Sequence, residues 1–223
     1  MSDARRQILG QIRRSLKRET LPATTAAELA ARLANHPRHL IPARVARDQA
    51  GLVALFVEMA SAANASVTRL ATRAEVPGAV ATLLAQENLP AQLVASPALQ
   101  DLPWGDRPLL SVRFDRAHGA DHVSVTPAFA GIAETGTLML VSGADTPSTL
   151  NFLPDSHVVV LKASDVVGPY EDALDRLRAR GDGLPRTINF VTGPSRTGDI
   201  EQTIQLGAHG PRRLHILLVE GDG

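Results

Sequence analysis

The run Val158-Val159-Val160-Leu161 is apolar at every position, and similar short strand-like runs recur through the second half of the chain. The others are Val123–Thr126, Thr137–Val141, Thr187–Thr192 and Leu214–Val219. Strands with one solvent-exposed face alternate apolar and polar residues, so runs that are apolar nearly throughout indicate a sheet covered on both faces. The sequence therefore predicts a central, largely parallel sheet.

Helical segments surround these runs in the alternating order typical of α/β proteins. One helix is well marked after Pro169, because Glu171 and Asp172 lie at its start and Gly181 stands where it should stop. Earlier strands are expected at Ala65–Leu70, Ala91–Ala95 and Leu109–Phe114. We predict a three-layer α/β/α domain over residues 47–223, preceded by an N-terminal helical arm over residues 1–46.

Composition limits the classes of function. The chain has 223 residues, 44% of them hydrophobic, and a formal net charge of zero, so it lacks the basic excess of a dedicated nucleic-acid binder. It has no cysteine, which excludes disulfides and an iron–sulfur cluster held by its own thiolates. No apolar stretch approaches the roughly 20 residues that span a bilayer, and we expect a cytoplasmic protein without a transmembrane segment.

The first helix has two unlike faces. Its apolar stripe consists of Ile8, Leu9, Ile12 and Leu16. Its other face is basic and carries Arg5, Arg6, Arg13, Arg14, Lys17 and Arg18. The helix either docks on its own domain or a partner, or it binds a membrane surface or nucleic acid. The narrow stripe without an aromatic anchor favours docking.

Polar, glycine-rich turns interrupt the strand-like runs. They are Gly131–Thr137, Asn151–Asp155, Gly193–Glu201 and Gly207–Arg212. Loops at the ends of parallel strands are where open α/β sheets gather ligands. We therefore expect these turns to contribute to one site.

The turn that begins at Gly193 carries the strongest signal for a ligand. Asp199 and Gln202 have the spacing of a helix cap, so a strand-to-helix junction is expected, and exposed backbone N–H groups there favour an anion. The candidate ligand-binding residues are Gly193, Ser195, Arg196, Thr197 and Asp199. The alternative is a tight turn with an ordinary cap, but Arg196 exceeds what capping requires.

Glu134 is the candidate catalytic residue, with Thr135 and Gly136 as ligand-binding neighbours. A carboxylate beside a glycine turn can act as a base, as a nucleophile or as a hydrogen-bond acceptor. It can equally be structural and accept N–H bonds from its own turn. No partner histidine can be assigned to it from the sequence.

The last turn adds His209 and Arg212, an imidazole and a guanidinium that could lie beside the same ligand. Asp155 is interpreted as a turn residue, since Pro-Asp commonly forms turns. The histidines at 122, 157 and 215 lie on or beside strands without the spacing of metal ligands. We predict no metal site and identify no cofactor.

In order and spacing these motifs resemble the lactate utilisation protein C family, also described as LUD-domain proteins. The resemblance rests on Ala133–Thr137, Leu153–Asp155, Gly193–Glu201 and His209–Arg212. It implies a fold similar to ribose-5-phosphate isomerases, glucosamine-6-phosphate deaminases and coenzyme A transferases. It also implies participation in oxidation of L-lactate to pyruvate beside separate iron–sulfur protein subunits.

The leading hypothesis is thus a cytoplasmic subunit of an L-lactate-oxidising system that binds a small anionic ligand or a cofactor at the glycine-rich turns. A stand-alone acyl, coenzyme A or sugar-phosphate enzyme using Glu134 is the second hypothesis, although a shared fold is weak support for shared chemistry. The third is a non-catalytic assembly subunit that docks through its basic first helix.

Overall fold

The computed structural model describes residues 3–17, 21–197 and 205–221. Contacts divide the chain into two units, residues 1–40 and 41–223. The first unit holds α1 (Asp3–Ser15) and α2 (Ala23–Asn35), and neither helix has a buried residue. The domain boundary expected after residue 46 stays a prediction.

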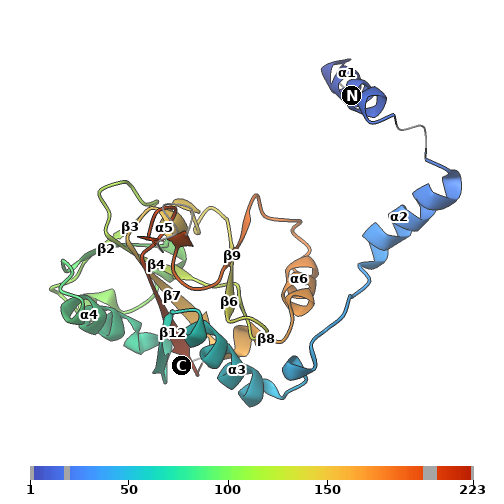
Figure 1. The fold of residues 1–223 in the computed structure, drawn as a ribbon. Coiled ribbons are helices and arrows are strands. Elements are labelled where there is room, and N and C mark those ends of the chain that lie inside the picture. The colour runs from blue at the N-terminus through green and yellow to red at the C-terminus, as the bar shows by residue number, and fades with distance from the viewer. Residues whose placement is uncertain (1–2, 18–20, 198–204, 222–223) are drawn as a thin grey trace. The chain divides into compact units, whose positions relative to one another are not determined.

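A parallel sheet of six strands forms the centre of the second unit (Figure 1). Its strands are β1 (Ser66–Leu70), β2 (Gln92–Ala95), β3 (Ser111–Phe114), β4 (Val123–Pro127), β7 (Ser156–Lys162) and β12 (Arg213–Val219). They lie in the order β1-β12-β7-β4-β2-β3, and every neighbouring pair is parallel. The predicted central parallel sheet is confirmed.

A second sheet takes two of the runs that were expected in the central one. Its strands are β5 (Ala130–Ile132), β6 (Thr137–Val141), β8 (Val166–Val167) and β9 (Ile188–Val191). They lie in the order β8-β5-β6-β9, and β6 is antiparallel to both of its neighbours. The assignment of the runs at 137–141 and 187–192 to the central sheet is therefore wrong.

The reason for that error lies in the packing of β6. Leu138 and Leu140 face the core that lies against the central sheet, whereas Met139 faces α6 (Tyr170–Ala179) with Ala173 and Leu177. A strand buried on both faces is apolar throughout, whatever the direction of its neighbours. Continuous apolarity thus reports two-sided burial and not parallel pairing.

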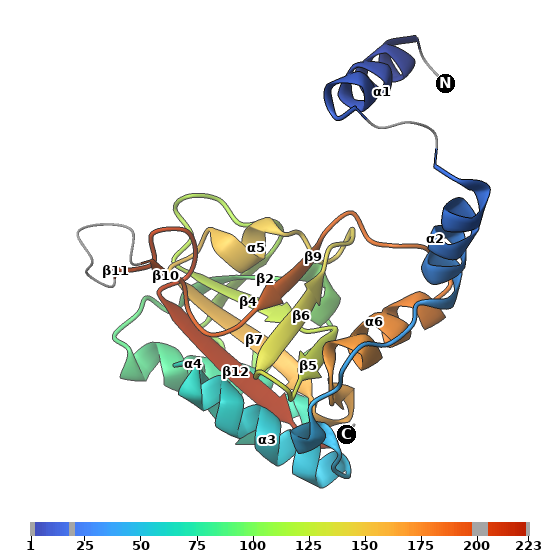
Figure 2. The same cartoon turned by 45° about the vertical axis from the view of Figure 1, so that its right-hand side comes forward.

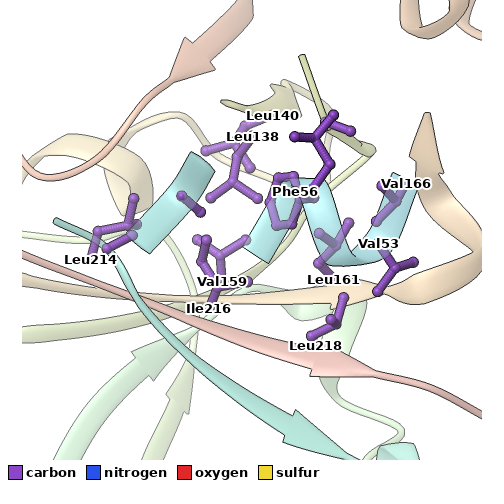
Figure 3. Packing of buried hydrophobic residues seen from close by; sticks show 14 of the residues in the cluster. Val53, Phe56, Leu138, Leu140, Val159, Leu161, Val166, Leu214, Ile216 and Leu218 are labelled. Atoms are coloured by element: carbon purple, nitrogen blue, oxygen red, sulfur yellow. The ribbon is translucent and has the colours of Figure 1, made fainter. Parts of the chain in front are cut away.

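One face of the central sheet is covered by α3 (Gln49–Ala62) together with the second sheet. Figure 3 shows Phe56 of α3 between Leu138 and Leu140 of β6 on one side and residues of β7 and β12, including Val159 and Ile216, on the other. Phe56 has no exposed surface. The ring therefore joins α3 to both sheets.

The opposite face is covered by α4 (Val76–Gln86) and by the chain around Leu99 and Trp104. The core there uses alternate residues of the same strands, such as Val158 and Val160 of β7. α6 covers the outer face of the second sheet (Figure 2). The predicted three-layer α/β/α architecture is confirmed, with the second sheet and α6 as additions to it.

The helix signals in the sequence also agree with the structure. Pro169 directly precedes α6, and Gly181 follows it with a φ of 76°, a left-handed conformation that glycine adopts easily. Pro77 lies in the first turn of α4. Thr72 makes no side-chain cap bond, but Glu75 accepts a hydrogen bond from the Ala71 N–H at 3.2 Å.

Shorter elements complete the described chain. They are α5 (Thr149–Phe152), the antiparallel ribbon of β10 (Arg196–Thr197) and β11 (Gln205–Leu206), and 3₁₀ turns at Ala43–Val45, Arg73–Glu75, Pro97–Leu99, Trp104–Asp106 and Ala163–Asp165. In the part of the chain that the structure describes, no helix has both the length and the apolar character needed to cross a bilayer.

Candidate ligand-binding site

A pocket of about 240 Å³ lies where β7 and β12 begin and β9 ends. Its walls come from three of the predicted turns and from the strands beside them. The lining residues are Asn151, Phe152, His157, Phe190, Val191, Thr192, Gly193, Pro194, Ser195, His209, Gly210, Pro211 and Leu214. The structure thus brings the turns at 151–155, 193–197 and 207–212 together at the amino ends of two central strands.

Backbone hydrogen bonds hold two of these turns against each other. The Ser195 N–H donates to the Pro211 carbonyl oxygen at 2.8 Å, and the Gly207 N–H donates to the Ser195 carbonyl oxygen at 3.0 Å. A Cβ atom at Gly210 would lie 3.5 Å from the Ser195 Cβ, an ordinary van der Waals distance, so the two turns lie close together there. Both backbone groups of Ser195 are therefore hydrogen-bonded to neighbouring turns, and the residue lines the pocket.

This pairing limits which backbone groups of the turn can meet an anion. Arg196 and Thr197 continue as strand β10, so in the described part of the turn no helix begins and the Ser195 N–H is not available to an anion. Asp199, with Gln202 as its capping partner, lies outside the described residues. The helix expected from Asp199, and an anion site at its start, therefore stay predictions.

Arg196 itself is exposed and does not line the pocket. Its Nη2 lies 3.5 Å from the Ala63 carbonyl oxygen, at the long limit of a hydrogen bond. Thr197 is half-buried. Both remain predictions as ligand-binding residues, since the side chain of Arg196 is free to reposition at the surface.

The predicted site glycines have structural reasons to be glycine. Gly136 has a φ of 66°, and a Cβ atom there would lie 2.2 Å from the Ala60 backbone nitrogen. Gly193 has a φ of 71°, and its Cβ would lie 2.0 Å from the Ala63 carbonyl oxygen. Both turns therefore press against the carboxyl end of α3, where any larger residue would collide with its backbone.

Glu134 lies in the turn between β5 and β6, half-buried, and it does not line the pocket. Its backbone N–H donates to the Gly168 carbonyl oxygen at 3.1 Å. Its carboxylate makes no hydrogen bond or ion pair with any residue that the structure describes. The structural alternative, in which it accepts N–H bonds from its own turn, finds no such bond among the described residues, and its catalytic role stays a prediction.

A chain of hydroxyl groups leads from this turn to the pocket. The Thr135 and Thr137 hydroxyls lie 2.6 Å apart, and the Thr137 hydroxyl lies 2.6 Å from that of Thr192, which lines the pocket. The Tyr170 hydroxyl joins them at 2.9 Å from Thr135 and 3.0 Å from Thr137. The fourth predicted turn is thus connected to the pocket wall without forming part of it.

The cationic side chains of the last turn differ in position. His209 is exposed and lines the pocket. Arg212 is exposed beside it, with its Nε 3.7 Å from Asp155 Oδ1, and His122 Nδ1 lies 3.9 Å from the other carboxylate oxygen. Asp155 is thus a turn residue that also faces two basic side chains. These contacts are exposed and contribute little to stability.

The sequence did not single out His157, which borders the pocket with no exposed surface. Its Nε2 lies 2.7 Å from the Thr126 hydroxyl, and its Nδ1 has no hydrogen-bond partner among the described residues. Burial lowers the pKa of His157 to about 3, because the charged imidazolium would be cut off from water. The imidazole is therefore neutral at physiological pH.

Asn151 was noted only as part of its turn. Its side chain is 6% exposed, lines the pocket, and makes no hydrogen bond with the residues that the structure describes. Because this carboxamide lines the pocket and has no protein partner among the described residues, it is available to hydrogen-bond with another molecule. The available signal was a polar residue in the turn that precedes an apolar strand.

The described residues contain no group of three or more His, Cys, Asp or Glu side chains placed to hold a metal ion. The unpaired groups around the pocket are a carboxamide, an imidazole and hydroxyls. Such a set suits a ligand that is recognised by hydrogen bonds.

Comparisons with known proteins identify relatives. A family model described as LUD domain matches residues 53–219. The chain is 30% identical over 194 residues to the lactate utilization protein C of Deinococcus radiodurans, covering 82% of this chain and 85% of that protein. It is 34% identical over 101 residues to the lactate utilization protein C of Bacillus subtilis, covering 44% of this chain and 42% of that protein.

Other matches are shorter or structural. An uncharacterized protein of Neisseria meningitidis serogroup B is 39% identical over 95 residues. That match and the Bacillus subtilis match span less than half of each relative, 41% and 42% of its length. A crystal structure of a DUF162 family protein from Deinococcus radiodurans superposes with a TM-score of 0.60 at 26% identity, covering 78% of this chain and 99% of that one.

Proposed function

Because the chain belongs to the LUD domain family, we propose that it is a cytoplasmic subunit of a system that oxidises L-lactate to pyruvate. In this proposal it binds a small anionic ligand at the pocket between the turns at 151–155, 193–197 and 207–212. Separate iron–sulfur subunits carry the electrons.

The names of several relatives support the part played by lactate. The proteins of Deinococcus radiodurans and Bacillus subtilis are called lactate utilization protein C, and the former aligns over most of its length. Oxidation of L-lactate to pyruvate releases two electrons and two protons. A chain without cysteine has no thiolate to hold a cluster that could receive the electrons, which favours separate electron-carrying partners.

The observation that carries the ligand proposal is the convergence of three turns, two of them rich in glycine, on one pocket. His209 and the Ser195 hydroxyl lie at its wall, and Arg212 belongs to the same turn as His209. A carboxylate could accept hydrogen bonds from these groups, with Arg196 adding positive charge from the neighbouring strand.

Glu134 is proposed to act near the reacting centre, as a base or as a nucleophile. Its carboxylate has no partner within the described residues, so no structural bond has to break for it to react. The hydroxyls of Thr135, Thr137 and Thr192 connect its turn to the pocket wall. Movement of the turn toward the pocket would be needed, because Glu134 does not line it.

The subunit proposal is tested by anaerobic purification of the tagged chain from its native cell grown on L-lactate. Recovery of cysteine-rich iron–sulfur proteins, with lactate-dependent dye reduction in the eluate, is the expected result. The same cells grown without lactate are the control. A single, inactive chain under both conditions would contradict the proposal.

The anion part is tested by calorimetric titration of the purified chain with L-lactate and pyruvate. Arg196→Ala should weaken binding at an unchanged melting temperature. Arg178→Ala is the matched control, because it removes a surface cation paired with Asp175 on α6. Equal affinity of the wild type, Arg196→Ala and Arg178→Ala for these anions would show that Arg196 does not bind the ligand.

A role in assembly is a second candidate, favoured by the N-terminal helices. α1 and α2 have 13 residues each and no buried residue, and helices of this length are marginal in water unless they pack on something. The apolar stripe and basic face of α1 fit an acidic groove with an apolar floor. Deleting residues 1–18 should then abolish partner recovery and spare binding of small molecules.

A further inference from the structure

We propose that the ligand of this pocket is an anion that carries a flat heteroaromatic ring, held between Phe152, Phe190 and the side chain of Asn151. This inference rests on the proposed function, in which the pocket is the ligand site, and it names the chemical class of the ligand. The supporting features are an aromatic rim, a polar floor without partners, and the size of the pocket.

The rim carries two exposed phenylalanines from different elements. Phe152 ends α5 and is 41% exposed, and Phe190 of β9 is 43% exposed. No other aromatic side chain of the described chain is exposed to this degree. The Phe190 ring is supported by Tyr170, with the ring centroids 5.5 Å apart. Aromatic side chains at a pocket stack on the flat ring of a ligand, and this accounts for the exposure of Phe152 and Phe190.

The floor supplies polar groups that no residue of the described chain satisfies. The carboxamide of Asn151 offers two N–H donors and a carbonyl acceptor, and the Nδ1 of His157 adds one neutral donor or acceptor. The amide-like edge of a heteroaromatic ring presents donors and acceptors side by side. A three-carbon acid alone would leave the phenylalanines exposed while it paired with these groups.

The volume of the pocket sets an upper limit on the size of the ligand. Sites for drug-sized ligands measure roughly 300–1,000 Å³, and this pocket has about 240 Å³. It therefore suits one ring system and not a dinucleotide. The anionic substituent is assigned to the side of His209 and Ser195, where the pocket opens to polar groups.

The test uses the purified full chain and three ring-bearing anions, with L-lactate in parallel. FMN is followed by its fluorescence, and AMP and nicotinate by calorimetry. We expect saturable binding of at least one of these probes to the wild type. If no probe binds at millimolar concentration, the ring proposal is overturned. The ring proposal would also be overturned if the exposed phenylalanines bound a co-purifying protein and none of the ring-bearing anions.

Two variants locate the binding. Asn151→Leu should weaken the bound probe by about tenfold or more, as expected for lost hydrogen bonds to a buried group. Its melting temperature should be unchanged or higher, because the carboxamide has no partner in the free chain. Asn189→Leu is the matched control, since the Asn189 Nδ2 has no partner among the described residues and Asn189 does not line the pocket. If Asn151→Leu does not fold, Phe190→Ala at the exposed rim serves instead.

Unchanged probe affinity in Asn151→Leu and Phe190→Ala would overturn the assignment to this pocket. The two proposals fail separately. Binding of L-lactate and recovery of iron–sulfur partners without any bound ring would leave the proposed function standing. A bound ring that responds to Asn151→Leu, in a chain without partners or lactate-dependent activity, would overturn the lactate role alone.

Discussion

The hydroxyl of Thr137, which is completely buried, lies 2.6 Å from the hydroxyl of Thr192 at the wall of the pocket. Thr137 begins β6 directly after the turn that holds Glu134, and Thr192 follows β9. This contact joins the two turns on the face of the second sheet that α6 covers, where Tyr170 also lies. The position of the Glu134 turn therefore depends on hydroxyl groups and not only on apolar packing.

Replacing Thr137 by Val should lower the free energy of unfolding by about 1–3 kcal/mol, because the hydroxyls of Thr135, Tyr170 and Thr192 would lose a buried partner. Urea unfolding measures the change. Thr192→Val is the control, and since Thr192 is exposed it should cost less than about 1 kcal/mol. An equal decrease in the free energy of unfolding in the two variants would show that the burial of Thr137 does not strengthen its hydrogen bonds.

Gly193→Ala should destabilise the protein by at least about 2 kcal/mol, because the residue has a positive φ and its new methyl group would lie 2.0 Å from the Ala63 carbonyl oxygen. Chemical denaturation measures this as well. Gly105→Ala is the control, since a methyl group there meets nothing within 4 Å. A Gly193→Ala protein as stable as Gly105→Ala would show that the turn can move off α3.

The sequence predicts the strands of this fold well and the sheet to which each belongs less well. The runs at 158–161 and 214–219 lie centrally in the parallel sheet, where both of their faces are buried. The run at 137–141 has the same pattern because α6 covers its second face. Which surface buries a strand depends on contacts distant in sequence, which a local pattern does not contain.

The candidate site divides in the same way. Glycine and proline mark the turns, so their convergence could be expected, and three of them line one pocket. The direction of a side chain could not be predicted. Arg196 lies in a ribbon strand outside the pocket, whereas His157, an isolated polar residue at the start of an apolar strand, has an unpaired nitrogen beside it.

The free energy of unfolding should decrease as the pH is lowered, because of His157. Its pKa in the folded chain is about 3, below the ordinary value of 6.5, so the unfolded chain binds the proton more tightly. The stabilisation is fully present above pH 6.5 and is lost progressively as the pH falls toward 3, by roughly 1.4 kcal/mol for each pH unit at most.

This dependence is measured as the melting temperature between pH 7 and pH 4.5. His157→Gln, which removes the buried imidazole and keeps a polar partner for Thr126, should show a shallower slope than the wild type. His39→Gln, at an exposed position, should keep the slope of the wild type. Parallel slopes for all three proteins would mean that His157 does not titrate as a buried group.

Removal of residues 1–40 should leave the melting temperature of the remaining chain within about 4 °C of the full-length value, since 1 kcal/mol corresponds to roughly 2–4 °C in a chain of this size. The reason is that α1 and α2 have no buried residue and belong to a unit separate from the core of residues 41–223. Differential scanning calorimetry measures the change. Phe56→Ala in the full chain shows the sensitivity of the measurement, because losing this fully buried ring should cost about 3–5 kcal/mol. A truncated chain that melts as early as Phe56→Ala would show that the N-terminal helices pack on their own domain, and their exposed apolar stripes would then not be free for a partner.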